Sequence, residues 1–214
     1  MADRLDRTMH RGAGGLAAFG LTDDESELLL DLAETAIRAS LMGHRAPDLD
    51  VAELPPALRQ RRGTFVTLHV AGELNGCLGN IEGTGSLAVD VPDHAIGAAF
   101  EDPRLPALRP DDLTAVSIEI SLLSSPSRVP ATTRAELLRH LRADEHGLIL
   151  ECGRKRALLL PAVWRQLRQP DRFVDQLLRK ARLPVDPWPT GVRAAVFTTS
   201  AVHRRLDEGA SRAG

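Results

Sequence analysis

The order of predicted elements limits the folds open to this chain more than any other feature. Residues 63–122 predict strand, turn, strand, helix and strand, and residues 147–199 predict strand, turn, strand, helices and strand. The two segments share almost no residue identity, so the repeat is one of topology. We therefore predict an α+β fold of two ββαβ-like units, in which mostly antiparallel sheets carry packed helices. Two hairpins that arose independently would produce the same pattern.

Local signals support the individual elements. Residues 116–122 alternate apolar and polar, which is typical of a half-buried strand. The segments 22–25 and 133–136 have the spacing of a capping box, so a helix is expected to follow each. Ser86 is expected to cap another helix, and residues 193–202 predict the last strand.

The chain is expected to hold one folded region between two loose ends. We predict a flexible leader over residues 1–20, a folded domain over 21–204 and a flexible tail over 205–214. The leader has no long apolar run and is not a signal peptide, and no stretch is long enough to span a bilayer. Cys77 and Cys152 offer no disulfide framework, which suits a reducing compartment. The expected location is the cytoplasm, with no membrane partner.

Charge and composition exclude a globally basic nucleic-acid binder. The 27 Lys and Arg residues face 29 Asp and Glu residues, which gives a net charge of −2. Aromatic residues make up 3% and tyrosine is absent, so a base-stacking platform is not expected. Nearly all the cations are arginines, which suit bidentate contacts to carboxylate or phosphate, although genomic base composition would explain the same bias. Nucleic acid is therefore not an expected partner.

The most unusual short segment surrounds Cys77, which lies between Gly76 and Gly79 at the end of a predicted hairpin. Glycines allow a tight backbone path and bring amide donors close to a ligand. One interpretation makes Cys77 a nucleophile, a redox thiol or a radical-accessible site. The other makes it a small buried residue in a strand, as free cysteines most often are. A nucleophile would need a lowered thiol pKa.

His69 lies on the partner strand and would approach Cys77 in only one register. If the turn of the hairpin has two residues, Cys77 lies opposite Val66 and His69 points to the other face. If the turn has three residues, Cys77 lies opposite Thr67 and His69 is its diagonal neighbour on the same face. The pattern leaves both registers open.

A helical face carries Asp90, Asp93 and His94, which are spaced to hold a metal ion. The commoner interpretation of such a group is a solvated polar face, and no recognised metal motif supports the other. No metal site is therefore predicted.

The segment that ends this helix contains Asp102 and Arg104 on either side of a proline. Arg104 is expected to pair with Asp102 or with Glu119 on the following strand, which would fix a turn. A second interpretation makes Arg104 an anion clamp beside Cys77. The basic run 154–156 at another hairpin turn would bind phosphate, or would be a solvated face.

Four segments, taken in order, resemble the AMMECR domain family. They are residues 63–68, 72–79, 98–104 and 118–121. The resemblance extends over about residues 22–203. It implies a two-part α+β fold and a role as component A of a three-protein set, whose other members are a Memo-like protein and a radical S-adenosylmethionine enzyme. The resemblance defines neither a reaction nor a cofactor.

The resemblance also implies which residues form the site. The glycine–cysteine motif of the family corresponds to residues 76–79, its second motif to residues 102–104, and its strand carboxylate to Glu119. Asn75 stands where the family usually has arginine, so hydrogen bonding is kept and the charge is lost. The residues predicted to bind a ligand around the catalytic candidate Cys77 are Asn75, Gly76, Gly79, Asp102, Arg104 and Glu119.

Two hypotheses of function follow. In the first, the chain is an accessory or enzyme component that acts with a Memo-like protein and a radical S-adenosylmethionine enzyme, and Cys77 lines the working pocket. In the second, it is a non-catalytic adaptor that binds a partner protein or an anionic ligand. An unusually reactive Cys77 favours the first hypothesis and an inert one favours the second.

Overall fold

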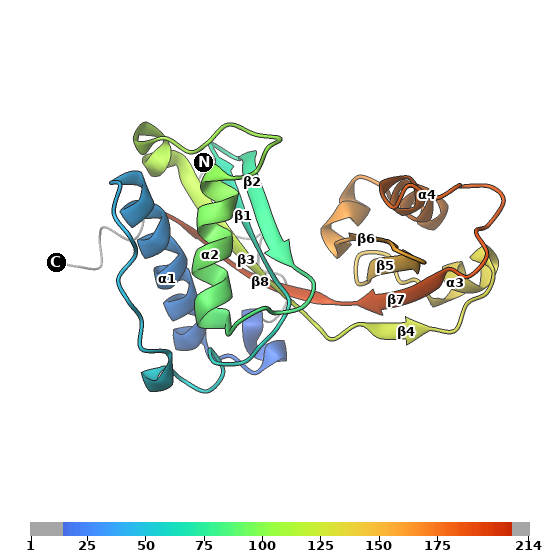
Figure 1. Ribbon diagram of the computed structural model, residues 1–214, viewed down its shortest axis with the longest axis horizontal. Coiled ribbons are helices and arrows are strands. Elements are labelled where there is room, and N and C mark those ends of the chain that lie inside the picture. The colour runs from blue at the N-terminus through green and yellow to red at the C-terminus, as the bar shows by residue number, and fades with distance from the viewer. Residues whose placement is uncertain (1–14, 207–214) are drawn as a thin grey trace, which may run out of the picture. The chain divides into compact units, whose positions relative to one another are not determined.

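The computed structural model describes residues 15–206, and its contacts divide the chain into two compact units. Unit 1 runs to Leu123 and resumes at Ser200, and unit 2 is Ser124–Thr199. Each unit has a four-stranded sheet and a hydrophobic core of its own (Figure 1). The predicted α+β class with antiparallel sheets is confirmed.

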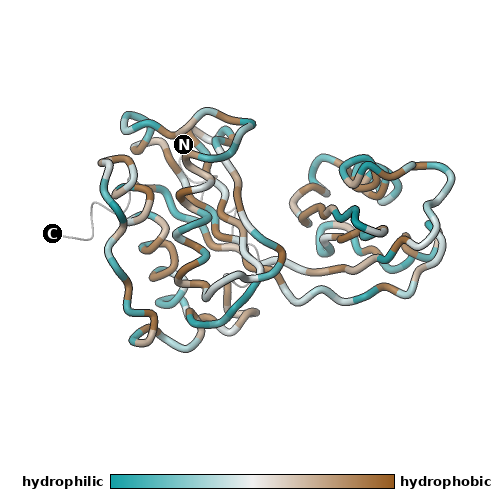
Figure 2. The backbone as a smooth tube through the Cα atoms, viewed as in Figure 1, coloured by the Kyte–Doolittle hydropathy of each residue, from teal (hydrophilic) through white to brown (hydrophobic). Residues whose placement is uncertain are grey.

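Unit 1 packs two helices against one face of its sheet. Its elements are η2 (Gly15–Phe19), α1 (Asp23–Leu41), η3 (Val51–Glu53), β1 (Thr64–Val70), β2 (Glu73–Asn80), α2 (Leu87–Phe100), η4 (Pro110–Ala115), β3 (Val116–Leu123) and β8 (Thr199–Arg205). The strand order is β2-β1-β3-β8, and α1 lies beside α2 (Figure 1). Hydrophobic and hydrophilic stretches alternate along α1 (Figure 2), because only one side of the helix faces the core.

Unit 2 is smaller and repeats the order strand, strand, helix, strand. Its elements are β4 (Ser127–Val129), α3 (Arg134–His140), β5 (Gly147–Cys152), β6 (Lys155–Leu159), η5 (Pro161–Arg165), α4 (Pro170–Lys180) and β7 (Arg193–Phe197). The strand order is β4-β7-β5-β6. At the centre of its core, the rings of Trp164 and Phe173 stack with centroids 3.9 Å apart.

Both predicted capping boxes form. The Thr22 hydroxyl accepts from the Glu25 amide at 3.2 Å, and the Glu25 carboxylate accepts from the Thr22 amide at 2.8 Å. Thr133 and Glu136 make the equivalent pair at the start of α3. These caps depend only on residues three positions apart, so the sequence pattern is sufficient to predict them.

The start of α2 differs from the prediction. The Ser86 side chain makes no capping hydrogen bond; the buried Asp90 carboxylate instead accepts from the amides of Thr84 and Gly85, each at 2.8 Å. His94 is also buried, with its Nε2 at 3.2 Å from Asn80 Nδ2. The interpretation of this helix side as a solvated face is therefore wrong at Asp90 and His94, because folding packs both against the glycine-rich loop.

The register of β1 and β2 combines the two alternatives left open by the sequence. The turn has two residues, and it pairs Val70 with Glu73, as the first register requires. A β-bulge then leaves Asn75 as an extra residue, and beyond it Cys77 lies opposite Thr67, as the second register requires.

The last predicted strand, 193–202, is two strands in different sheets. The break lies at Thr198, whose amide donates to Ser124 Oγ at 3.0 Å, while Ser124 N donates to Thr198 O at 3.0 Å. These bonds join the two segments by which the chain enters and leaves unit 2. The sequence predicted a single strand because residues of high β propensity continue through Thr198, where the chain passes from one sheet to the other.

The predicted loose ends are shorter than expected within the described residues. Residues 15–19 form a 3₁₀ helix that buries Leu16 and Phe19 in the core of unit 1. At the other end, Arg205 belongs to β8 and Leu206 is fully buried. The rest of the predicted leader and tail, residues 1–14 and 207–214, lies outside the described residues.

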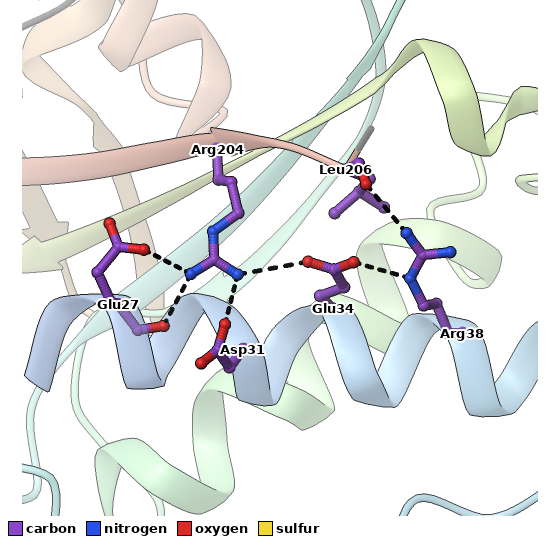
Figure 3. Close-up of polar contacts among 6 residues, drawn as sticks. All are labelled: Glu27, Asp31, Glu34, Arg38, Arg204 and Leu206. Atoms are coloured by element: carbon purple, nitrogen blue, oxygen red, sulfur yellow. Dashed lines mark hydrogen bonds and ion pairs between the residues drawn. The ribbon is translucent and has the colours of Figure 1, made fainter. Parts of the chain in front are cut away.

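The last strand is tied to the first long helix by a cluster of ion pairs (Figure 3). Arg204 on β8 contacts the carboxylates of Glu27, Asp31 and Glu34, which follow one side of α1. Arg38 on the same helix donates to the Leu206 carbonyl at 3.0 Å. Within residues 15–206, no helix has the length and apolarity that a membrane crossing requires.

Candidate functional site

Two predicted site residues, Cys77 and Glu119, and the Thr67 between them form a row across the sheet of unit 1. Cys77 on β2 pairs with Thr67 on β1, and Thr67 pairs with Glu119 on β3. Directly opposed residues of adjacent strands share a face, so thiol, hydroxyl and carboxylate follow one another across three strands. All three are half-buried, whereas Val66 and Leu68, which point to the helices, are fully buried. The row therefore lies on the sheet face that α1 and α2 do not cover.

Asp102 links this row to the end of α2. Its side chain is only 4% exposed, and its carboxylate accepts from the Cys77 amide at 3.0 Å. The same carboxylate accepts from the Arg104 main-chain amide at 3.1 Å, from Nε at 2.9 Å and from Nη2 at 2.6 Å. The hydrogen-bonded Arg104 guanidinium holds the pKa of Asp102 well below its usual range. Asp102 is therefore charged throughout the neutral range.

Arg104 is oriented by this carboxylate and yet is exposed. Two of its nitrogens hydrogen-bond to Asp102, while 65% of its side chain is accessible to solvent. The hydrogen bonds that the guanidinium donates to Asp102 raise its pKa. Of the two partners expected for Arg104, the structure shows Asp102, and it shows no contact with Glu119 among the described residues. The guanidinium is held in one orientation with a solvent-facing side.

Cys77 is a protonated thiol in this environment. Burial raises the pKa of the thiol above its ordinary value, and this outweighs the lowering by the Thr67 hydrogen bond and by Arg104. The Thr67 hydroxyl donates to Cys77 Sγ at 3.3 Å. A neutral thiol suits a binding surface better than it suits a nucleophile.

Thr67, and not His69, is the partner of the thiol. Within residues 15–206, the structure gives no hydrogen bond between His69 and Cys77. Sequence reasoning placed Thr67 opposite Cys77 in one register but did not assign it to the site. The missing information was the bulge at Asn75, which no local residue pattern signals.

The two glycines beside Cys77 are required for packing. A Cβ at Gly76 would lie 1.8 Å from the carbonyl oxygen of Ala98 on α2. A Cβ at Gly79 would lie 2.2 Å from the Thr64 carbonyl oxygen and 2.6 Å from the Phe65 ring. These contacts explain both glycines through the close approach of the backbones. Contact of either glycine with a ligand remains a prediction.

Asn75 secures the loop that follows Arg104. Its side chain is buried at the bulge, and its Nδ2 donates to the Pro106 carbonyl at 3.0 Å. Its Oδ1 is buried and has no hydrogen-bond partner in the described part of the chain. Asn75 therefore holds the loop after Arg104 in place, without the positive charge that arginine would carry, and its contact with a ligand stays a prediction.

The arrangement offers recognition chemistry. It combines a fixed, exposed guanidinium with a neutral thiol and with Glu119, whose carboxylate accepts from Ser121 Oγ at 3.4 Å. Such a surface binds an acidic group through the cation and hydrogen-bonds a polar neighbour. Among residues 15–206, no three Cys, His, Asp or Glu side chains are grouped so as to hold a metal ion.

A two-unit α+β fold with this glycine–cysteine strand defines the class of protein. The AMMECR1 family matches residues 30–202, and the chain belongs to that family. A protein of Methanothermobacter thermautotrophicus is 37% identical over 170 residues, which are 78% of this chain and 86% of the relative. A protein of Methanosarcina acetivorans is 32% identical over 192 residues, covering 88% of this chain and 96% of the relative.

A solved structure has the same fold. The crystal structure of an uncharacterised protein from Pyrococcus horikoshii matches with a TM-score of 0.78 and 28% sequence identity. The match covers 88% of this chain and 95% of that one. The similarity therefore extends over both units.

Proposed function

We propose that the chain is a cytoplasmic component that acts with a Memo-like protein and a radical S-adenosylmethionine enzyme. Its working site is the surface around Cys77 and Arg104, where it binds an acidic group of a ligand or of an intermediate. The partners come from the family resemblance. The site comes from the geometry of unit 1.

The observation that carries this proposal is the position of Asp102. One carboxylate that is almost completely buried binds both the Cys77 amide and the Arg104 guanidinium. A turn could be fixed by the main-chain bonds alone. In addition, Nε and Nη2 of Arg104 both donate to the Asp102 carboxylate, which restricts the rotation of this exposed side chain. The restriction lowers the entropy cost of binding an anion.

The alternative, a non-catalytic adaptor, is favoured by one observation. The raised pKa of Cys77 leaves little thiolate, and no histidine is hydrogen-bonded to the thiol among the described residues. The adaptor would use the same Arg104 surface to bind an anionic ligand or a partner protein. The two functions differ in whether the radical enzyme turns over faster in the presence of this chain.

The experiment measures the formation of 5′-deoxyadenosine from S-adenosylmethionine in a mixture of the three proteins. This readout does not require the final substrate to be known. We expect Arg104→Gln to lower the stimulation by this chain about tenfold, since it removes one charge-assisted contact. Arg109→Gln is the matched control, because Arg109 is a 77% exposed arginine in the same connection between α2 and β3.

Cys77→Ser and Cys77→Ala test the thiol in the same mixture. We expect the serine variant to retain more stimulation than the alanine variant, because a hydroxyl keeps the polar contact with Thr67. Full stimulation by both variants would remove the thiol from the site. If Arg104→Gln and Arg109→Gln both stimulate 5′-deoxyadenosine formation as well as the unchanged chain does, the proposal is wrong. If the unchanged chain gives no stimulation, the role in the radical reaction is wrong and the adaptor function is favoured.

A further inference from the structure

The two units carry opposite charges, which the net charge of the chain conceals. Fourteen of the 27 Lys and Arg residues fall in Ser124–Thr199, with seven of the 29 acidic residues, so unit 2 has a formal charge of +7. The remainder of the chain holds 13 basic and 22 acidic residues and has a formal charge of −9. The total of −2 therefore does not describe the surface that a partner of unit 2 would meet.

The few acids of unit 2 are mostly engaged by a minority of its cations. The ion pairs are Arg134 with Asp171 and Asp175, Arg142 with Glu145, and Glu151 with both Arg156 and Arg193. Glu136 caps the start of α3 instead. Ten of the fourteen cations stand outside these pairs.

Four of those cations lie on two segments of the chain that the fold brings side by side, and we call this place the corner. Arg154 lies in the turn between β5 and β6, and Lys155 begins β6. Arg179 lies in the last turn of α4, and Arg182 lies two residues beyond its end. Lys155 Nζ donates to the Arg182 carbonyl at 2.6 Å, which joins the turn to the helix end. None of the four has an acidic partner within residues 15–206. Their side chains are all exposed.

This corner fits an acidic protein segment better than a nucleic acid. Of the four aromatic rings of unit 2, Trp164, Phe173 and Phe197 are at most 2% exposed and Trp188 is half-buried, so the unit has no row of exposed rings on which bases could stack. The strand beside the corner, β6, is at the edge of its sheet, and no described strand pairs with its outer side. An extended peptide can pair its backbone with such an edge, whereas a nucleic acid cannot.

We propose that the corner formed by Arg154, Lys155, Arg179 and Arg182 is a docking surface for an acidic, extended segment of a partner protein. Cations at a helix end and on an edge strand also occur for structural reasons. Those reasons apply to single charges. Docking additionally explains why four exposed cations lie together without an acidic partner, in a unit where four other arginines pair with acids. The inference concerns unit 2 and does not depend on the Cys77 surface.

The test is binding of a fluorescent poly-glutamate peptide to the full chain, followed by anisotropy at low and at physiological salt. The corner variant is Arg154→Gln with Arg179→Gln and Arg182→Gln. The control variant, Arg128→Gln with Arg139→Gln and Arg172→Gln, removes the same charge from exposed arginines elsewhere on unit 2. Thermal melting checks that both variants are folded.

We expect the corner variant to bind the peptide about tenfold more weakly and the control to change by less than about twofold. Added salt should weaken binding to the unchanged chain. An equal loss in both variants, or no binding of the peptide at low salt, overturns the docking surface. A labelled DNA duplex is measured in parallel, and tighter binding of the duplex than of the peptide overturns the protein partner.

Discussion

The two hairpins of the molecule have the same topology and different consequences. In unit 2, β5 and β6 pair without interruption from Leu148–Leu159 to Cys152–Lys155. In unit 1, the bulge at Asn75 shifts the pairing by one residue, so that Cys77 lies opposite Thr67. Without the bulge, Cys77 would lie opposite Val66, which is fully buried. One extra residue thus decides that the thiol belongs to the polar face and not to the core.

The comparison extends to charge. The acidic unit 1 carries the surface that we propose binds an acidic group, and the basic unit 2 carries the proposed docking corner. The two units therefore share a topology and differ in charge, and a shared topology does not imply a shared function. Paired substitutions, one in each unit, test this comparison.

The largest effect is expected in the core of unit 2. Phe173→Ala removes a fully buried ring that stacks on Trp164, and it should lower the free energy of unfolding by about 3–5 kcal/mol. Both tryptophans, Trp164 and Trp188, belong to unit 2, so tryptophan fluorescence follows that unit alone. Ile120→Ala, in the core of unit 1, should shift the circular-dichroism transition and not the fluorescence transition. Coincident transitions in both variants would show that the units unfold together.

Gly76→Ala is expected to have the next largest effect. The added Cβ would lie 1.8 Å from the Ala98 carbonyl oxygen, so β2 must move away from α2, at a cost of about 3 kcal/mol. The control glycine in unit 2, Gly153, lies in the turn of the other hairpin, with a φ of +58° and no atom within 4 Å of an added Cβ. Gly153→Ala should therefore cost only about 1 kcal/mol, from backbone strain. Chemical denaturation of both variants measures the difference, and equal costs would contradict the packing role of Gly76.

Asp102→Asn is expected to cost about 2 kcal/mol near neutral pH, because a charge-assisted network becomes neutral. The pKa of Asp102 is lowered in the folded state, so its stabilisation is present above the ordinary carboxyl pKa and is lost as the pH falls through the lowered value. The unfolding free energy of the variant should therefore depend less on acid pH than that of the unchanged chain. Asp144→Asn, at an exposed acid of unit 2, is the control. Parallel pH profiles for the Asp102 variant and the unchanged chain would refute the assignment.

Arg204→Gln is expected to have the smallest effect. Its side chain is 13% exposed and contacts three carboxylates of α1, so its loss should cost about 1–2 kcal/mol (Figure 3). Arg193 in unit 2 is 63% exposed and pairs with Glu151, so Arg193→Gln should cost less than about 0.5 kcal/mol. Thermal melts at low and high salt measure both. A larger loss at Arg193 would reverse the ranking of the two pairs.

Much of the fold could be predicted from short-range patterns. The capping boxes at Thr22 and Thr133 require only neighbours within one helical turn, and the alternation of residues 116–122 needs only the two-residue period of a strand. The ββαβ order of both halves followed from such elements. Cys77, Asp102 and Arg104 were singled out by their residue types and by a family resemblance, and the structure brings these three together.

Other features required the complete structure, because they depend on contacts between distant residues. The amino-acid sequence alone determined where helices begin, which strands alternate and which residues are chemically unusual, since these follow from local spacing. Only the tertiary structure decided that a bulge turns Cys77 away from the core, that Asp102 joins it to Arg104, and that the chain's charge is divided between two units. Each of these features results from contacts between segments that lie far apart along the chain, and local spacing carries no information about such contacts.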